Sequence, residues 1–305
     1  MQTTITSNSV AIIIVNWNSF EYTSVCIQSL QKVQYDSFTI LVVDNGSEDQ
    51  SSLKIAHEFP EVVMIRNEKN LGFTGGNNRG IQWALERGFP YIMLLNNDTE
   101  VHPGFLYPLV EKIKESEEVG AVQPKMYFMH DKKRIWNAGG RFYPFIGKTA
   151  TIGYNVIDSG QFEAMQKVDW ITGCCILVSS RVIREVGLLD DRFFAYYEDV
   201  DWSFRIRESG KSLWFVPQSF IYHVAGASST SKVKGKEGYL SAFAHYLNVR
   251  NNILLIRKHD KLIFRIPTFV FQLFKVMGYL VYFIARRRWG KFRAVLKGVS
   301  DGMTK

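Results

Sequence analysis

Short apolar runs alternate with longer amphipathic segments through the first half of the chain. The runs are rich in Val, Ile and Leu and apolar almost throughout, as expected for strands that helices cover on both faces. They occupy residues 10–15, 39–43, 62–65 and 91–95. The segments between them, residues 20–33, 50–59 and 76–87, are near helical length. This alternation predicts right-handed βαβ units and an α/β fold with a mostly parallel sheet flanked by helices.

The pattern changes after Gln123, where aromatic and glycine-rich segments predict irregular strands and loops. A short strand at residues 175–178, a helix ending near Gly187 and a further helix at Glu198–Glu208 are expected. Residues 225–238 are small and polar with few apolar positions, which predicts a mobile loop or lid.

Toward the C-terminus, polar side chains recur at spacings of three and four residues, which places them on one stripe of a helix. They are Arg265, Thr268, Gln272, Lys275, Tyr279, Tyr282 and Arg286. The intervening positions are largely apolar, so an amphipathic helix is predicted. Spanning a membrane would place Lys275 near the bilayer centre at a cost of about 3 kcal/mol. A helix lying in the membrane interface is therefore preferred, and packing on the preceding domain or on a second copy in a homodimer is the alternative.

The composition is that of a globular protein. The 305 residues are 46% hydrophobic and 22% charged, which excludes a disordered tail protein and a polytopic membrane protein. The net charge of +8 is unevenly placed: residues 250–305 hold 13 basic and two acidic residues, leaving 24 basic and 27 acidic residues before them. A basic groove along a folded domain would not divide the charge in this way, so no nucleic acid partner is expected. The cluster at 286–293 suits anionic lipid headgroups instead.

The cysteines indicate a reducing compartment. There are three, with no spacing typical of a zinc site or a disulfide framework. The first residues have neither the basic nor the apolar part of a signal peptide. We therefore expect a cytoplasmic protein.

Polar residues follow the second and fourth apolar runs, beginning with Asp44 in one case and ending with Asp98 in the other. Ligands of open α/β sheets bind at the carboxyl ends of strands, so these positions are candidate site residues. A hard carboxylate such as that of Asp98 suits Mg²⁺ or Mn²⁺, which commonly bridge protein to a diphosphate. Residues 70–80 are glycine-rich and could offer backbone N–H groups to an anion, although they match neither the dinucleotide nor the P-loop pattern. A turn and a helix N-cap are the structural alternatives.

A third acidic cluster, formed by Glu198, Asp199 and Asp201, follows an aromatic segment at 193–197. Like charges close together in a partly apolar setting raise one another's pKa, which is one way to make a general acid or base. A solvated helix N-terminus is the alternative. His223 follows a short apolar segment and is either an ordinary packed residue or a ligand.

Together these segments resemble the family 2 inverting glycosyltransferases of the GT-A fold, in particular their bacterial rhamnosyltransferase-like branch. The resemblance covers roughly residues 8–258. It rests on VNWN at 15–18, VDNGS at 43–47, NLGF at 70–73, GNN at 76–78, LNND at 95–98, TG at 172–173, FF at 193–194, EDVDW at 198–202, YH at 222–223 and RN at 250–251. The order and spacing of so many motifs make a chance match improbable.

The resemblance implies a role for each cluster. Nucleotide-sugar binding falls to Asn16, Asp44, Asn70, Gly72, Asn77 and Asn97. Asp98 matches the last residue of the family's DxD metal motif, whose first position here is Asn96, and His223 matches an additional metal ligand; Mn²⁺ or Mg²⁺ is the implied cofactor. Asp199 is the expected catalytic base, with Asp201 as the alternative and Glu198 beside them. The acceptor side is assigned to Trp170, Thr172, Gly173, Trp202 and Arg250.

The implied organisation is a catalytic domain at 8–240, followed by a helical extension at 241–305. Residues 8–123 would bind the nucleotide-sugar and 124–240 the acceptor. The implied activity is the inverting, metal-dependent transfer of a sugar to a lipid-linked or polysaccharide acceptor on the inner face of the cell membrane, with residues 262–293 on the anionic surface. By branch resemblance the donor is dTDP-rhamnose, and a UDP-sugar or a non-catalytic partner of an assembly complex is the alternative.

Overall fold

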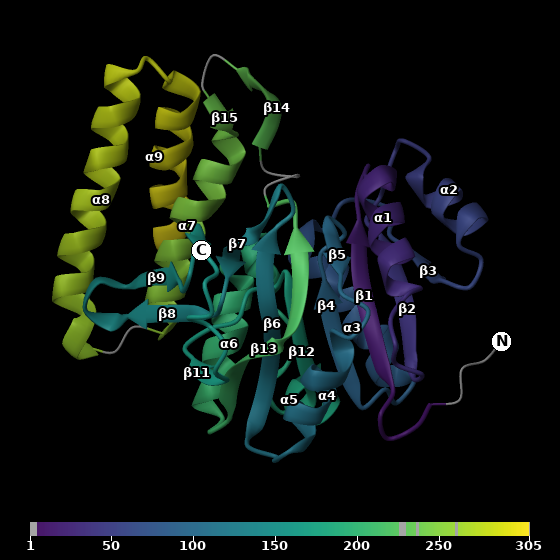
Figure 1. Ribbon diagram of the computed structural model, residues 1–305. Coiled ribbons are helices and arrows are strands. Elements are labelled where there is room, and N and C mark those ends of the chain that lie inside the picture. The colour runs from purple at the N-terminus through teal and green to yellow at the C-terminus, as the bar shows by residue number, and fades with distance from the viewer. Residues whose placement is uncertain (1–4, 226–229, 236–237, 260–261, 305) are drawn as a thin grey trace. The chain divides into compact units, whose positions relative to one another are not determined.

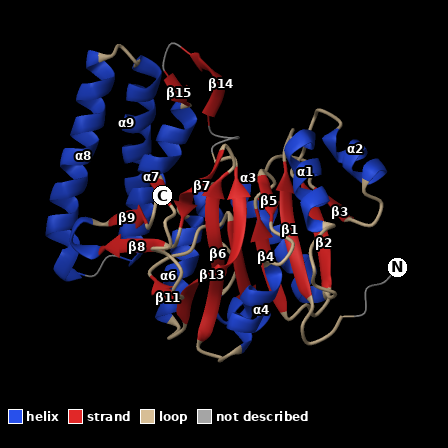
Figure 2. Ribbon diagram, viewed as in Figure 1, coloured by secondary structure: helices blue, strands red, loops and turns tan. Residues whose placement is uncertain are grey.

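The computed structural model describes residues 5–225, 230–235, 238–259 and 262–304, which fall into two compact units (Figure 1). The first unit comprises residues 5–141, 151–194 and 198–225, and the second comprises residues 142–150, 195–197 and those from 230 onward. The α/β fold class is confirmed, with strands and helices alternating along the first unit (Figure 2).

The first four long strands form a parallel sheet in the order β4-β1-β2-β3. Alternate residues of β1 serve opposite faces: Ile12 is buried in one cluster with α1 and α2, and Ile13 in another with α3. Both faces are therefore covered, which explains why these strands are apolar throughout. The bounds are β1 Val10–Asn16, α1 Phe20–Leu30, β2 Phe38–Asp44, α2 Ser51–Glu58, β3 Val63–Arg66, α3 Gly72–Glu86 and β4 Tyr91–Leu95.

The same sheet continues with mixed pairing. β12 lies antiparallel between β4 and β6, and β13 runs parallel to β6. The bounds are β5 Thr99–Val101, α4 Leu106–Lys114, β6 Val119–Phe128, β7 Asp131–Asn137, β10 Val156–Ile157, β11 Gln166–Val168, β12 Cys175–Ser179, α5 Ser180–Val186, η2 Asp191–Phe193, α6 Glu198–Glu208 and β13 Ser212–His223. The strands β8 (Gly140–Tyr143) and β9 (Lys148–Thr151) pair around η1 (Pro144–Ile146).

The glycine-rich segment lies further inside a helix than the sequence suggests. We expect α3 to begin at residue 76, whereas it begins at Gly72. The glycines allow the helix to lie against the sheet: a Cβ on Gly80 would come within 2.5 Å of Ile13 Cγ2, and one on Gly76 within 2.9 Å of Val15 Cγ1. Close packing on β1, rather than a flexible cap, is what these glycines provide.

The prediction of a loop at 225–238 is wrong for part of that segment. Residues 230–235 form β14 (Thr230–Gly235), which pairs antiparallel with β15 (Gly238–Leu240). Residues 226–229 and 236–237 lie outside the described residues.

The second unit is built on three long helices. α7 (Ala242–His259) and α8 (Arg265–Ala285), separated by η3 (Leu262–Phe264), are followed by α9 (Trp289–Thr304). α9 approaches α7 closely because it presents glycines: a Cβ on Gly298 would lie 2.8 Å from the Tyr246 carbonyl oxygen. Val249, Phe283 and Val295 form the small buried core that the three helices share.

The amphipathic helix α8 packs with its polar stripe inward. Thr268 is 1% exposed, and its Oγ1 donates to the Pro144 carbonyl oxygen at 3.1 Å. Gln272 Nε2 donates to the carbonyl oxygen of Ile146 at 2.9 Å, and Lys275 Nζ to Asn252 Oδ1 at 3.1 Å. The apolar side is left outward, with large side chains exposed at Ile266, Phe269, Leu273, Phe274, Met277, Val281 and Ile284.

This orientation changes the argument about Lys275. Its amine faces the interior of the unit, where burial, reinforced by the charge of Lys148, lowers its pKa to about 8. The cost of placing Lys275 in lipid therefore does not arise for a helix that presents its other face to a membrane. By length and composition α8 also meets the requirements of a membrane span, a test that core helices of soluble proteins pass as well.

Candidate active site

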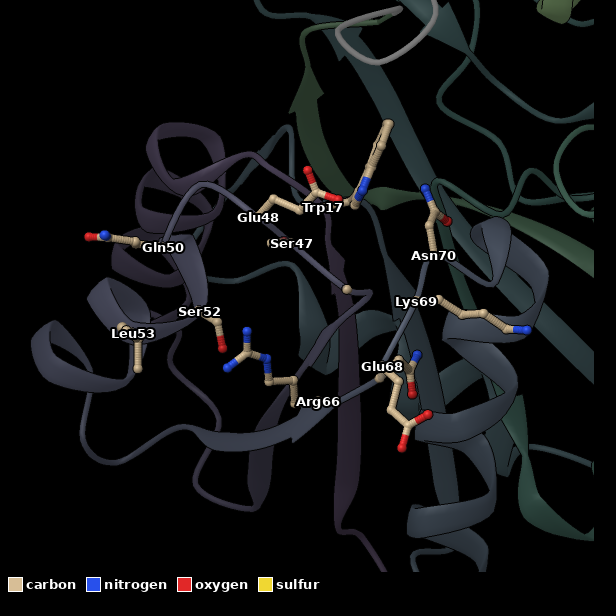
Figure 3. Close-up of a pocket in the computed structure, with 12 residues that line it drawn as sticks. Trp17, Ser47, Glu48, Gln50, Ser52, Leu53, Arg66, Glu68, Lys69 and Asn70 are labelled. Atoms are coloured by element: carbon tan, nitrogen blue, oxygen red, sulfur yellow. The ribbon is translucent and has the colours of Figure 1, made fainter.

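A pocket of about 850 Å³ lies at the carboxyl ends of the parallel strands (Figure 3). Its lining comes from three strand-end segments: Trp17 after β1, six residues between Gly46 and Leu53 that follow β2 and enter α2, and Arg66–Asn70 at the end of β3. Trp17 is 48% exposed, unusual for so large an apolar ring, and it offers a stacking surface at the pocket. The lining carries both charges, with Arg66 and Lys69 beside Glu48 and Glu68.

Asp44 lies beneath this pocket. It is fully buried; Asn16 Nδ2 donates to its Oδ1 at 3.1 Å, and Arg66 Nε lies 3.7 Å from its Oδ2. Asn16 is also fully buried, and its Nδ2 lies within hydrogen-bond distance of Ser47 Oγ and Ser51 Oγ. Asp44 and Asn16 therefore orient groups that face the pocket, and Arg66 and Ser47 present the polar atoms there.

Asn45, which is not among the site residues expected from the sequence, organises the loop after β3. Its Nδ2 donates to Asn70 Oδ1 at 3.0 Å and to the Gly72 carbonyl oxygen at 2.9 Å. Its Oδ1 accepts from Asn67 Nδ2 at 3.0 Å and from the backbone N–H of Leu71 at 3.1 Å. One side chain thus fixes residues 67–72. The only signal in the sequence is its place beside Asp44 at a strand end.

Gly72 is required for the first turn of α3. Its φ is +76°, and a Cβ there would lie 2.4 Å from the Phe194 carbonyl oxygen, which accepts from the N–H of Thr74. Asn77, expected to bind the nucleotide-sugar, donates instead to the carbonyl oxygen of Phe73 within its own helix at 2.9 Å.

Asp98 and His223 meet at the junction of the two parts of the sheet. His223 Nε2 lies 3.0 Å from Asp98 Oδ1, and the two residues are 4% and 8% exposed. The pairing of β13 with β5 brings them together across 125 positions of sequence. Trp136 packs edge-on against the imidazole, with ring centroids 4.2 Å apart, which fixes its plane.

This pair fits a divalent cation. Ligand atoms in adjacent octahedral positions at about 2.1 Å from Mg²⁺ lie about 3.0 Å apart, and Asp98 Oδ1 and His223 Nε2 have this separation. The part of the chain that the structure describes holds no cluster of three or more His, Cys, Asp or Glu suited to a metal. The remaining positions would fall to water and substrate oxygens, as is common for Mg²⁺.

Asn97 is held by α1. Its Nδ2 donates to Thr23 Oγ1 at 3.0 Å, and Thr23 Oγ1 donates in turn to Asn16 Oδ1 at 2.8 Å. Asn97 is thus connected to the pocket floor through Thr23 rather than placed on the pocket lining.

Asp199, in the first turn of α6, is held by amides. Its Oδ2 accepts from the N–H of Gly173 at 2.9 Å and its Oδ1 from the N–H of Val200 at 2.8 Å. Burial raises its pKa, and these bonds together with one from the Thr172 hydroxyl oppose the rise. Each oxygen retains a lone pair, so the group can accept a proton from a nearby hydroxyl.

Glu198 has the opposite environment. It is 5% exposed, and within the described residues its Oε2 has no hydrogen-bond partner. Burial, reinforced by the charge of Asp199, raises its pKa well above the usual range. We infer that Glu198 holds the proton while Asp199 is ionised, because a backbone N–H alone stabilises the charge of Glu198 whereas three backbone N–H groups and the Thr172 hydroxyl stabilise that of Asp199.

Asp201 and Trp202 are buried, and each is hydrogen-bonded to another group of the protein. Asp201 is fully buried and its Oδ2 accepts from Arg205 Nε at 2.9 Å. Trp202 is 1% exposed, belongs to the core and donates its Nε1–H to the Gly187 carbonyl oxygen at 2.9 Å. The interpretations of Asp201 as an alternative base and of Trp202 as an acceptor contact are therefore not supported, because α6 turns both toward the interior.

The backbone leading to the acidic cluster is strained. Phe194, Tyr196 and Tyr197 all have positive φ, of +64°, +70° and +70°. Such conformations are costly for aromatic residues and concentrate at functional sites. Within the second unit, Asn251 Nδ2 donates to the carbonyl oxygens of Ala195 at 2.7 Å and Tyr196 at 2.8 Å, which secures this turn.

The other expected acceptor residues, Trp170 and Arg250, belong to different units. Trp170 is 8% exposed and donates its Nε1–H to the Arg141 carbonyl oxygen at 3.2 Å. Arg250 belongs to the second unit, where it donates to Asn251 Oδ1 at 2.7 Å and lies over the ring of Tyr246.

Residues 11–186 match the family described as Glycosyl transferase family 2, which is more than half of the chain. The chain belongs to glycosyl transferase family 2. It is accordingly a glycosyltransferase, and the expectation drawn from the motifs is confirmed at this level.

Curated relatives of this glycosyltransferase are distant. The low-salt glycan biosynthesis hexosyltransferase Agl10 of Haloferax volcanii is 24% identical over 81% of this chain and 75% of its own. The N-acetylglucosaminyl-diphospho-decaprenol L-rhamnosyltransferase of Mycobacterium tuberculosis is 26% identical over 61% of this chain and 66% of its own. The dTDP-rhamnosyl transferase RfbF of Shigella flexneri is 26% identical over 77% of this chain and 76% of its own.

Solved structures share the fold. GalNAc-T7 with UDP, GalNAc and Mn²⁺ aligns with a TM-score of 0.62 at 16% identity, over 82% of this chain and 47% of that one. Residues 1–349 of Staphylococcus aureus TarS in complex with UDP align with a TM-score of 0.54 at 15% identity, over 83% of this chain and 67% of that one. The glycosyltransferase thus has a GT-A-like fold and spans less than half of the GalNAc-T7 chain.

Proposed function

We propose that this glycosyltransferase transfers a hexose from a nucleotide-sugar to a hydroxyl group of a lipid-linked glycan, inverting the anomeric carbon. The observation that carries the proposal is the position of Asp199, a partly buried carboxylate held by the N–H of Gly173, whose pKa burial raises toward that of a general base. The same unit holds the strand-end pocket and the Asp98–His223 pair.

The donor occupies the strand-end pocket in this proposal. Trp17 supplies a surface for stacking, and Arg66 and Ser47 supply polar contacts that Asp44 and Asn16 orient. The names of the mycobacterial and Shigella relatives favour rhamnose carried on dTDP. A UDP-sugar is the competing donor, because TarS was solved with UDP.

Asp199 acts as the base. Its carboxylate accepts the proton of the acceptor hydroxyl as that oxygen attacks the anomeric carbon from the face opposite the nucleotide. The amide of Gly173 keeps the carboxylate in one orientation, and the protonated Glu198 beside it adds no competing charge. Thr172 and Trp170 remain our candidates for the acceptor side.

Asp98 and His223 would hold the divalent cation, Mn²⁺ or Mg²⁺. When bound, such an ion supplies positive charge that stabilises a departing diphosphate. Trp136 keeps the imidazole of His223 in the plane that directs Nε2 toward Asp98.

We further propose that the enzyme works on the inner face of the cell membrane, bound through residues 262–293. The outward apolar side of α8 supports this location, with Phe269 64% and Phe274 68% exposed. At the end of α8 come three consecutive arginines, Arg286–Arg288, and the half-exposed Trp289. Cations and an indole beside an apolar helix face suit an anionic interface. A homodimer that covers the same face is the competing interpretation.

Turnover assays test the activity. The purified chain is incubated with a panel of dTDP-, UDP- and GDP-sugars, Mn²⁺ or Mg²⁺, and a diphospholipid-linked sugar acceptor. We expect acceptor-dependent nucleotide release with one donor, a loss of about 10²-fold to 10⁴-fold in Asp199→Asn, and normal release in the exposed control Glu185→Gln. Equal activity in wild type and Asp199→Asn would show that Asp199 is not the base. Donor binding without turnover would favour the non-catalytic alternative.

Vesicle co-sedimentation tests the location. We expect binding to phosphatidylglycerol vesicles that falls at high salt and is lost in Phe269→Glu/Phe274→Glu. The control Leu53→Glu changes an equally exposed leucine of the first unit and retains binding. A stable dimer in solution that the double variant dissociates, without vesicle binding, would replace the membrane proposal.

A further inference from the structure

A groove of about 470 Å³ lies among α7, α8 and α9 in the second unit. This volume is within the range typical of small-molecule sites. Its walls are mostly apolar, with Ile256 from α7, Leu273 and Val276 from α8, and Val299 from α9. The groove is separate from the strand-end pocket, whose lining comes entirely from the first unit.

The neutral polar side chains on the groove wall are already bonded. Thr268 Oγ1 donates to the Pro144 carbonyl oxygen and Gln272 Nε2 to that of Ile146. A buried polar group that has its partner does not require one from a ligand. These two residues are therefore compatible with an apolar occupant.

The charged residues of the groove lie at one end. Arg257 is near the end of α7 and Arg265 begins α8, whereas Val276 lies eleven residues further along α8, about 16 Å away at 1.5 Å per residue. Arg257 Nη1 donates to the Gly302 carbonyl oxygen at 2.9 Å, which leaves its other N–H groups for a ligand. No carboxylate forms an ion pair with either arginine in the described ranges 5–225, 230–235, 238–259 and 262–304. The groove is thus cationic at one end and apolar along the rest.

The groove is continuous with the exposed apolar side of α8. Phe269 and Leu273 line the groove, yet they are 64% and 46% exposed. An apolar chain could therefore pass from a bilayer into the groove past these side chains without crossing water, which would avoid the cost of exposing it.

We propose that this groove binds the hydrocarbon chain of the lipid diphosphate acceptor, with Arg257 and Arg265 facing its phosphates. Arginine suits phosphate because its planar guanidinium presents several donors. The assignment rests on the proposed function and names the substrate class for it: an acceptor recognised by its chain as well as by its sugar. A phospholipid, which also has phosphate and chains, is separated from the acceptor by the competition arm of the test.

Photolabelling tests the site directly. The full chain is mixed with phosphatidylcholine vesicles that contain a polyprenyl diphosphate with a diazirine in its chain, and crosslinks are mapped by mass spectrometry. We expect label on Leu273, Val276 and Val299, and competition by unlabelled polyprenyl diphosphate but not by phosphatidylglycerol. Label on Phe274, Met277 and Val281 without label on Val276 or Val299, or equal competition by phosphatidylglycerol, overturns the proposal.

Matched variants give a second readout. Leu273→Trp fills the groove, and Leu296→Trp makes the same change at an equally exposed leucine, 46% in both cases, on α9 outside it. Displacing even two methylene groups should lower labelling about tenfold in Leu273→Trp. Leu296→Trp should stay within about twofold of wild type. An equal loss in both variants, or none in Leu273→Trp, counts against the groove.

Transfer assays separate this proposal from the proposed function. Two acceptors share one sugar diphosphate head, and one has a long polyprenyl chain whereas the other has a short alkyl chain. We expect the ratio of their kcat/KM values to favour the long chain and to fall about tenfold in Leu273→Trp. Arg265→Gln should lower kcat/KM about tenfold for both acceptors, because both carry the diphosphate. Groove labelling without any transfer would refute the activity and leave the groove intact. Transfer whose chain-length preference is unchanged in Leu273→Trp would refute the groove alone.

Discussion

Thr23 Oγ1 donates a hydrogen bond of 2.8 Å to Asn16 Oδ1 and accepts one of 3.0 Å from Asn97 Nδ2. Asn16 in turn donates to Asp44. This chain of buried polar groups connects the floor of the strand-end pocket to the residue before Asp98. Such networks stabilise when every member is satisfied and are costly when one is removed.

Replacing Thr23 with Val keeps the shape of the side chain and breaks both of its bonds. We expect the free energy of unfolding to fall by about 1–3 kcal/mol and nucleotide affinity to fall with it, as measured by urea denaturation and calorimetry. Thr74→Val is the matched control, because Thr74 is fully buried and its Oγ1 has no partner within the described residues. An equal loss of stability in both variants would show that the network contributes nothing.

Asp98 is expected to control metal affinity. In the presence of a nucleoside diphosphate, Asp98→Asn should weaken Mn²⁺ binding by about 100-fold or more, because the remaining protein ligand is neutral. Titration followed by electron paramagnetic resonance measures this. Asp131→Asn, which removes a carboxylate paired with Arg134, should bind as the wild type does. Unchanged binding in Asp98→Asn would place the ion elsewhere.

Asp199 should set the acidic limb of the pH profile. A base must be unprotonated, so kcat/KM is lost as the pH falls through the raised pKa of Asp199. Thr172→Val removes a hydrogen bond that lowers this pKa and should shift the limb to higher pH. Ser159→Ala, in an exposed loop, should leave it unmoved. A limb that stays in place in Thr172→Val would assign the titration to another group.

Glu198 should make stability depend on pH. Its pKa is raised in the folded state, so its stabilising contribution is present below the unfolded pKa and is lost as the pH rises through the folded value. Glu198→Gln removes this loss. Thermal unfolding should therefore show an advantage of the variant that grows as the pH rises above the ordinary pKa range of glutamate. Parallel profiles for variant and wild type would mean that Glu198 is ionised in the fold.

Alanine substitutions at Gly72 and Gly88 distinguish the cost of backbone strain from the cost of steric overlap. Both have positive φ, of +76° and +79°, but a Cβ on Gly88 meets nothing within 4 Å whereas one on Gly72 overlaps Phe194. We expect Gly88→Ala to cost about 1 kcal/mol and Gly72→Ala about 1–3 kcal/mol more. Denaturant unfolding of the two variants gives the comparison. Equal costs would show that Phe194 moves aside freely.

The parallel half of the sheet could be predicted because its signal is local. Ile12 and Ile13 are both buried on opposite faces, so the whole of β1 reads as apolar, and the bounds of β1, β2 and β4 follow closely. The strand β14 could not be predicted, since its residues are small and polar. Its pairing with β15 leaves no hydrophobic periodicity in the sequence. α3 begins earlier than predicted because glycine usually ends helices, whereas here it allows contact with Ile13.

The acidic clusters were visible in the sequence, but the separate roles of their members were not. Asp199 and Asp201 are two residues apart on one helix and therefore point in different directions. One meets the amide of Gly173 and the other the guanidinium of Arg205. Asn45 could not be predicted as a site residue either, because its role depends on tertiary contacts. Its side chain makes four hydrogen bonds to residues more than 20 positions away.

The sequence by itself determined the alternation of strands and helices, the family motifs and the excess of positive charge at the C-terminus. It also determined that α8 has a polar stripe. Only the tertiary structure decided which side of α8 faces outward, because that depends on where Pro144, Ile146 and Asn252 offer partners. Periodicity fixes which residues share a face, and burial of that face is decided by what packs against it.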